Sequence, residues 1–122
     1  MTDEIKDGPY ETYWDNGRLR EKGTWKDGEL DGPYEEYHEN GQLESKGTMK
    51  DGEWDGPFVW YQDNGRLRLK GMYKDGDLDG LFEEYHENGQ LESKGTIKDG
   101  GWCGEWFLGG QTVIYPPCRE EV

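Results

Sequence analysis

Short runs of alternating aromatic and polar residues follow one another along the chain, and each ends in a turn signal. The first run, 9–14, is Pro-Tyr-Glu-Thr-Tyr-Trp, and a second run covers 19–26. Between them lies the pair Asn16-Gly17. Alternation with period two is typical of β-strands, and Asn-Gly is typical of a two-residue type I′ turn. The pattern therefore predicts a β-hairpin with Asn16 and Gly17 at its tip.

The same hairpin pattern recurs every 24 residues, which indicates stacked repeats. After an N-terminal tail, 1–7, four units align without a gap at 8–31, 32–55, 56–79 and 80–103. Residues 104–122 begin a fifth copy, which loses the motif; we expect a last hairpin and a cap there, stopped by Pro116-Pro117. The predicted fold is all-β: a single-layer antiparallel β-meander of 24-residue hairpins with about nine to ten strands.

The turn also predicts the register of each hairpin and the content of its two faces. With a two-residue loop, Trp14 pairs with Leu19, Tyr13 with Arg20, and Tyr10 with Gly23. The core face is then expected to collect these positions: Tyr10, Tyr34, Phe58, Phe82 and Trp106; Leu19, Leu43, Leu67 and Leu91; and Trp25, Met49, Tyr73 and Ile97. Aromatic rings lying over the bare backbone of the strand glycines at 23, 47, 71 and 95 would explain both residue types.

The opposite face is predicted to be polar, with a ladder of tyrosines at 13, 37, 61 and 85. Lysines at 22, 46, 70 and 94 lie on the same face, and three of them face Glu11, Glu35 or Glu83. The corner residues Leu30, Trp54, Leu78 and Trp102 are expected to fold back onto the edge of the core face.

The charge of the chain restricts its partners. The net charge is −14, and the second and fourth units carry −5 and −3 while the third is neutral. Such a field repels nucleic acid and anionic membranes and attracts basic surfaces. The chain has no apolar stretch long enough for a membrane span and no apolar signal region in its start, MTDEIKDG. We expect a cytoplasmic protein.

The recurring phrase DG-aromatic-x-x-Tyr-x-x-Asn-Gly-x-Leu-x-x-Lys-Gly-x-x-Lys-Asp-Gly resembles the MORN repeat. More closely, it is similar to the MORN variant found in bacterial YwqK-like antitoxin proteins. The resemblance covers about residues 6–107 and ends where Gly109 takes the place of a ladder tyrosine. It implies extended antiparallel sheets built from hairpins, and a role in binding or scaffolding, in some members as an antitoxin.

The acidic, glycine-rich corners are interpreted as turns rather than as metal loops. Residues 75–80, Asp-Gly-Asp-Leu-Asp-Gly, resemble the start of an EF-hand loop, but its twelfth position, which needs a bidentate Glu, is His86. The two histidines, His38 and His86, stand 48 residues apart, too far to share one zinc ion. With no phosphate-binding loop and no activated nucleophile, we predict no enzyme, no cofactor and no catalytic or metal site.

The two cysteines, Cys103 and Cys118, lie in the last 20 residues. Since a cytoplasmic protein is expected, two reduced thiols are predicted; the alternative is a disulfide that pins the C-terminus.

The third unit departs from the others. Val59 replaces the glutamate that faces a lysine, and Trp60 and Leu69 occupy a cross-strand pair that is polar in the other units. Together with Phe58 and Leu67, this patch has the composition of an anchor inside a charged rim. The alternative is that this face is simply core in the middle of the molecule.

These observations favour a non-catalytic, acidic protein-binding module that neutralises a basic partner. The partner would be a toxin, a nuclease or a defence complex, and a variant of the hypothesis is nucleic-acid mimicry, as in phage-encoded anti-CRISPR inhibitors. No direct nucleic-acid or membrane contact is expected. The alternative is an oligomerising MORN scaffold, and a homodimer is possible. The predicted partner-binding residues are Trp60, Leu69, Phe58, Tyr37, Tyr61, Tyr85, Glu35, Glu36, Glu83 and Glu84.

Overall fold

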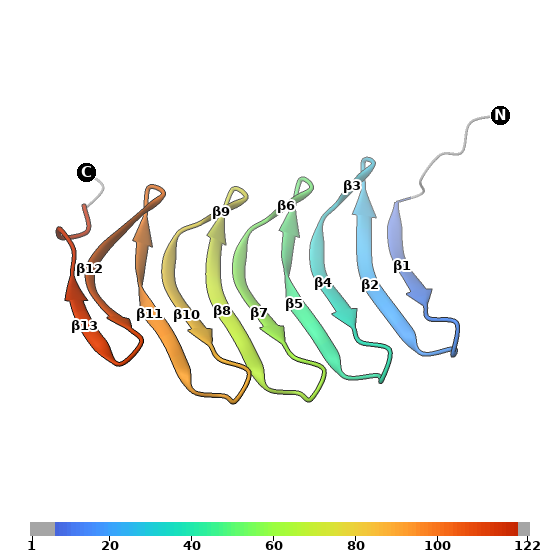
Figure 1. Ribbon diagram of the computed structural model, residues 1–122. Coiled ribbons are helices and arrows are strands. Elements are labelled where there is room, and N and C mark those ends of the chain that lie inside the picture. Colours follow the sequence, from blue (N-terminus) through green and yellow to red (C-terminus); the bar gives the residue numbers. More distant parts are fainter. Residues whose placement is uncertain (1–6, 120–122) are drawn as a thin grey trace.

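A computed structural model describes residues 7–119 as one open antiparallel sheet of 13 strands (Figure 1). The ten main strands follow one another in chain order, hairpin beside hairpin, in the order β1-β2-β4-β5-β7-β8-β10-β11-β12-β13. They are β1 (Gly8–Tyr13), β2 (Leu19–Lys26), β4 (Gly32–Tyr37), β5 (Leu43–Lys50), β7 (Gly56–Tyr61), β8 (Leu67–Lys74), β10 (Gly80–Tyr85), β11 (Leu91–Lys98), β12 (Gly101–Leu108) and β13 (Gln111–Ile114).

Three further strands of two residues pair only with the strand before them: β3 (Glu29–Leu30), β6 (Glu53–Trp54) and β9 (Asp77–Leu78). The predicted single-layer meander is therefore confirmed, with these short corner strands as an addition. In Figure 1 the hairpin tips lie along one side of the ribbon and the corners that join successive units lie along the other.

The hairpin tips differ from the two-residue type I′ turn that Asn-Gly predicts. The amide of Trp14 donates to the carbonyl of Arg18, and the amide of Gly17 donates to the carbonyl of Trp14, both at 2.8 Å. Gly17 has a φ of 87°, whereas Asn16 is not in the positive-φ region. This is a three-residue loop with a glycine bulge. Asn16 favours it because its side-chain oxygen accepts the amide of Arg18 at 2.9 Å.

The extra loop residue changes the register beside each tip. Tyr10 pairs with Gly23 as predicted, but a bulge follows Thr12, and Tyr13 is the residue that pairs with Leu19. The predicted pairs Trp14 with Leu19 and Tyr13 with Arg20 are therefore wrong. The other three repeat hairpins have the same shift after Glu36, Trp60 and Glu84.

The type I′ geometry occurs instead at the acidic corners, which confirms that these phrases are turns. Asp27 and Gly28 both have positive φ, 50° and 82°, between the paired residues Lys26 and Glu29. The aspartates at 51, 75 and 99 share this conformation. Asp and Gly are the residues that best tolerate it, so the sequence of the corner follows from its backbone.

The core lies where aromatic rings cover strand glycines. We call this side of the sheet the aromatic face; its rings are Tyr10, Tyr34, Phe58, Phe82 and Trp106. The most buried apolar side chains are Tyr34, Met49, Ile97, Cys103 and Trp106. Gly47 lies against Trp54 and Phe58, and Gly95 lies against Trp106. The predicted stacking of rings on glycines is confirmed, and the covering rings come both from the same unit, as Trp54 does, and from the following unit, as Phe58 and Trp106 do.

The C-terminal cap is held by a disulfide between Cys103 and Cys118, whose Cα atoms lie 4.8 Å apart. The prediction of two reduced thiols is therefore wrong for this structure. Two backbone hydrogen bonds explain the proximity: Gly104 donates to the carbonyl of Pro116, and Tyr115 donates to that of Gly104, both at 2.9 Å. The segment after β13 thus continues along β12 and brings the two sulfurs together.

Candidate protein-binding surfaces

The apolar patch of the third unit lies on the aromatic face. Trp60 on β7 pairs directly with Leu69 on β8, and Phe58 lies on the same side two residues before Trp60. Trp60 is 41% exposed, while Phe58 and Leu69 are partly buried. Phe58 is held by Trp54 and Tyr73, with ring centroids 4.7 and 5.6 Å away. The patch therefore combines a rigid base with an accessible indole.

Carboxylates lie on both sides of this patch, in the same row of residues that pair directly from strand to strand across the sheet. Leu69 pairs on its other side with Glu84, and Trp60 pairs on its other side with Ser45, which in turn pairs with Glu36. Strands in a sheet lie about 4.8 Å apart, so the row places an apolar centre between two acidic positions. The structure thus brings together five of the predicted residues: Phe58, Trp60, Leu69, Glu36 and Glu84.

The acidic end of this row contains a close contact between like charges. Glu21 and Glu36 are directly opposite each other in β2 and β4. The buried hydroxyl of Tyr34 lies 2.6 Å from a carboxylate oxygen of Glu21 and 2.7 Å from one of Glu36. Burial, and then these two hydrogen bonds, raise the pKa of Tyr34 strongly. The protonated hydroxyl is thereby kept between two carboxylates that would otherwise repel each other.

The other predicted residues lie on the opposite side of the sheet, which we call the charged face: Glu35 and Glu83, with Tyr37, Tyr61 and Tyr85. The hydroxyl of Tyr85 donates to Glu83 at 2.6 Å, and this bond is the main cause that raises the pKa of Tyr85. The pKa of Tyr37 is raised as well, mainly by burial and then by Glu35. Two residues before Tyr61 lies Val59, whereas Tyr37 and Tyr85 each have a glutamate at that position.

Acidic and basic residues alternate from strand to strand across the charged face. Lys22 pairs with Glu11 on one side and with Glu35 on the other, and Lys46 follows Glu35. Lys94 reaches Glu83 with a nitrogen–oxygen distance of 3.9 Å. This face is therefore a mixed row rather than a uniform negative one.

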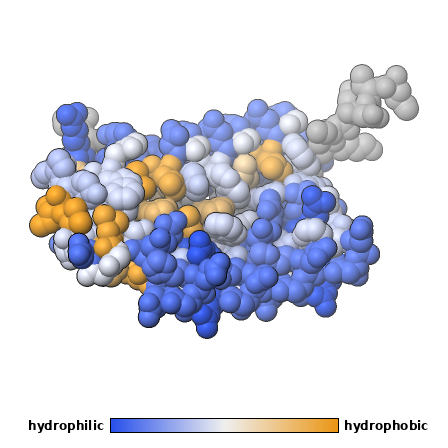
Figure 2. Space-filling model, in the orientation of Figure 1, coloured by the Kyte–Doolittle hydropathy of each residue, from blue (hydrophilic) through white to orange (hydrophobic). Residues whose placement is uncertain are grey.

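The predicted partner-binding residues thus form two surfaces. In a single-layer sheet the aromatic and charged faces point in opposite directions, so one rigid partner face cannot contact both. The aromatic face holds the exposed indole, and we take it as the principal candidate surface. In the space-filling view, hydrophilic residues dominate over the hairpin tips, and hydrophobic residues gather toward β12 and β13 (Figure 2).

A groove that the sequence did not predict lies between the third and fourth corners, with a volume of about 620 Å³. Leu78, Ile97 and Trp102 provide its apolar surface, and Asp75 and Asp99 contribute carboxylates. Trp102 is held by stacking on Trp106, with ring centroids 4.0 Å apart. The spacing of the acidic corners, 24 residues, was the available signal, but it did not show that two corners enclose a space.

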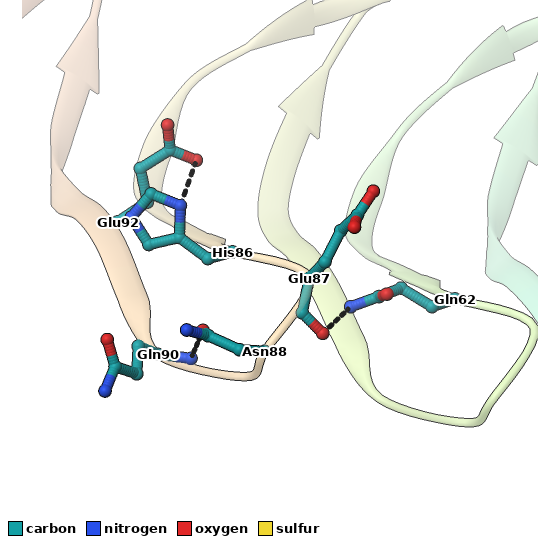
Figure 3. Close-up of polar contacts among 6 residues, drawn as sticks. All are labelled: Gln62, His86, Glu87, Asn88, Gln90 and Glu92. Atoms are coloured by element: carbon teal, nitrogen blue, oxygen red, sulfur yellow. Dashed lines mark hydrogen bonds and ion pairs between the residues drawn. The ribbon is translucent and has the colours of Figure 1, made fainter.

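The two histidines lie at separate hairpin tips and are not arranged to bind one metal ion together. His38 contacts the carbonyl of Tyr61 through Nε2 at 3.0 Å, whereas Nδ1 of His86 lies 3.9 Å from Glu92, as Figure 3 shows. His86 and Glu92 are both about half exposed, and such an ion pair contributes little. Within residues 7–119, no group of three or more potential ligands is arranged to hold a metal ion. The same part of the chain contains no helix that could cross a membrane.

The open sheet of stacked hairpins defines an all-β repeat protein. The model of the MORN repeat variant family matches four segments, 6–27, 30–51, 54–75 and 78–99, which are in phase with the four hairpins. The chain belongs to this family. Among curated proteins, none matches it.

Proposed function

We propose that this chain is a non-catalytic protein-binding module that neutralises a basic, nucleic-acid-acting partner such as a toxin, a nuclease or a defence complex. The observation that carries the proposal is the paired Trp60 and Leu69 on the aromatic face, with the indole 41% exposed and carboxylates in the same row. Aromatic anchors in an acidic surround are suited to basic protein surfaces.

The proposed mechanism has two steps. The net charge of −14 raises the rate of encounter with a basic partner, and the rigid sheet then covers the partner's working surface. We favour steering over nucleic-acid mimicry, because lysines interrupt the carboxylates of the charged face in every repeat.

The test is recovery of partners from the native host with the wild-type chain and with Trp60→Ala/Leu69→Ala. The matched control is Leu81→Ala/Ile114→Ala, which removes exposed apolar side chains elsewhere (65% and 79% exposed). We expect the first variant to lose a basic partner that the control retains. Equal recovery by all three chains would remove the proposed anchor. Association that stays equally fast in about 1 M salt, where the Debye length is about 3 Å, would remove the steering step.

A self-assembling scaffold is the second candidate, favoured by the partly exposed aromatic face, which would be covered in a homodimer. Light scattering separates the two candidates. If the protein is a monomer over the concentrations at which the partner binds, the binding module is supported. If it is a dimer, and Trp60→Ala/Leu69→Ala converts it to a monomer, the scaffold is supported.

A cytoplasmic location is also part of the proposal, although the bridge between Cys103 and Cys118 is of a kind that the cytosol disfavours, because it keeps most thiols reduced. Cell fractionation tests the location directly: the protein should be recovered with the cytosol. Recovery only with an oxidising compartment would remove this part of the proposal.

A further inference from the structure

The second, third and fourth hairpins are each joined to the hairpin before them in the same way. Two residues in the middle of the first strand of each of these hairpins pair with the preceding strand, and one of the two faces a lysine there. Lys22 faces Glu35, Lys46 faces Val59, and Lys70 faces Glu83. The preceding hairpin therefore presents a cation, and the following hairpin presents a carboxylate in two of the three junctions.

The hairpin tips show the same direction of donation. The indole nitrogen of Trp14 donates to the carbonyl of Tyr37 at 3.0 Å, and the amide of Asn16 donates to that of Glu39 at 2.9 Å. At the next tip, Asn40 donates to the carbonyl of Asp63 at 2.6 Å. Gln62 donates to Glu87 in the following junction, as Figure 3 shows. At these tips, backbone carbonyls therefore accept hydrogen bonds from side chains of the preceding tip.

The first hairpin carries the same acceptors. Glu11 occupies the position of Glu35, and the carbonyls of Tyr13 and Asp15 occupy the positions of the carbonyls that accept at later tips. In the described range, 7–119, β1 pairs only with β2, and no hairpin precedes it. Within residues 7–119, the outer edge of β1 therefore presents carbonyls without the side-chain donors that serve them at later tips. It also presents the carboxylate of Glu11, which pairs with Lys22 on its inner side and accepts the hydroxyl of Tyr13 at 2.7 Å.

The other end of this chain does not supply those donors. The last strand, β13, contains no cationic residue. Beyond it, the chain turns along β12 and is fixed by the bond between Cys103 and Cys118, with Pro116-Pro117 unable to extend a ladder. Head-to-tail stacking of two copies would therefore leave Glu11 without a cation opposite it.

We propose that the outer edge of β1 binds an antiparallel strand of a basic protein, with a lysine or arginine opposite Glu11. Main-chain hydrogen bonds to β1 provide the pairing, and the cation opposite Glu11 selects the register. This site is independent of the anchor at Trp60 and Leu69, because it lies at the sheet edge rather than on the aromatic face.

The test uses a synthetic peptide that copies 43–50, LESKGTMK, and records amide chemical shifts of the full-length protein during titration. The control peptides are a scramble of the same composition and a version with Lys46→Glu. We expect shifts confined to Gly8–Tyr13 and the first tip. We also expect the lysine peptide to bind about two- to five-fold more tightly than the glutamate peptide, the range of one cross-strand charge pair.

Charge reversal in the protein completes the test. Glu11→Lys should reverse the preference between the lysine and glutamate peptides, whereas Glu105→Lys, an exposed position on β12, should leave it unchanged. Trp60→Ala/Leu69→Ala should also leave it unchanged, so that failure of the proposed anchor and failure of this edge are separate results. The inference is overturned by absent shifts in β1, by shifts at β13 or around Trp60 instead, or by equal binding of the scramble. Dimerisation of the free protein through β1 would overturn it as well.

Discussion

The indole ring of Trp106 lies against the backbone of Gly95, where a methyl group would overlap the ring. Trp106 is fully buried, and its ring nitrogen donates to the carbonyls of Thr96 and Cys103 at 3.1 and 3.2 Å. Because both hydrogen bonds hold the ring in place, it cannot move away from an added side chain. A thin sheet obtains its core in this way, by letting large rings approach bare backbone.

Substitution of the strand glycines by alanine should therefore destabilise the protein in a graded order. Gly95→Ala is expected to cost about 3 kcal/mol or more, the upper range for overpacking. Gly71→Ala should cost least, because its nearest neighbours are the side chains of Leu78 and Phe82 at 3.2 and 3.6 Å. Urea denaturation followed by tryptophan fluorescence measures both. Gly101→Ala is the control, since a methyl group there meets only a carbonyl at 3.7 Å. Equal losses at 71 and 95 would contradict the account of the core.

The asparagine at a hairpin tip should matter most where its side chain also donates to the next tip, as at Asn16 and Asn40. Asn40→Asp keeps the oxygen that accepts the amide of Gln42 but replaces the donor to the carbonyl of Asp63 with a repelling oxygen. We expect a loss of about 1–2 kcal/mol in the free energy of unfolding. Asn88→Asp is the matched control, because Asn88 also accepts a local amide, that of Gln90. Thermal or urea unfolding that ranks the control as equally unstable would argue against the tip-to-tip ladder.

Removal of the disulfide should weaken the C-terminal cap. The bridge closes a loop of 15 residues, for which chain entropy alone corresponds to about 3 kcal/mol. Cys118→Ser is therefore expected to unfold at a lower urea concentration than the oxidised wild type. Adding a reductant should bring the wild type to the level of the variant and leave the variant unchanged. A wild-type protein that is insensitive to reductant would show that the bridge does not support the fold.

Alkaline pH should destabilise the protein, with Tyr34 as a main contributor. Burial and the carboxylates of Glu21 and Glu36 raise the pKa of Tyr34 far above the ordinary tyrosine value of about 10. A raised pKa in the folded state means that this stabilisation is complete below about pH 10. It is lost as the pH rises further, because the unfolded chain then releases a proton that the folded chain retains.

Urea unfolding at a series of pH values between about 9 and 12 measures this dependence. In Tyr34→Phe the decline with pH should be shallower than in the wild type. The variant should also be less stable near pH 7, by about 1 kcal/mol, since the hydroxyl no longer separates the two carboxylates. A decline of unchanged steepness would mean that Tyr34 ionises normally in the folded protein.

Much of the fold could be predicted because its signals are local. The alternation of Tyr10 with Glu11, the spacing of the glycines and the repeated turn residues all act within one hairpin. The pairing of Tyr10 with Gly23, the core face and the acidic corners follow from them. The third-unit patch at Trp60 was also visible as a break in the repeat, and the structure places it on the aromatic face.

The tip geometry could not be predicted from the same signals. Asn-Gly and Asp-Gly both permit a type I′ turn, yet only the Asp-Gly corners adopt it. At the tips, Asn16 accepts a local amide and donates to the carbonyl of Glu39, and this contact with the next tip accompanies the longer loop. In the part of the chain that the structure describes, Asn64 and Asn88 accept the same local amide in loops of the same geometry without donating to the next tip, so the preference follows from this local bond, which the Asn-Gly rule does not include.

The amino-acid sequence by itself determined the repeat period, the hairpins and the residues of each face, because strands and turns obey rules that span only a few residues. The tertiary structure decided which ring covers which glycine and that Cys103 meets Cys118. It also decided that the predicted binding residues divide between opposite faces and that, among the described residues 7–119, β1 pairs only with β2. These features depend on side chains that reach across strands from one hairpin to the next, and such distances exist only once the hairpins have stacked.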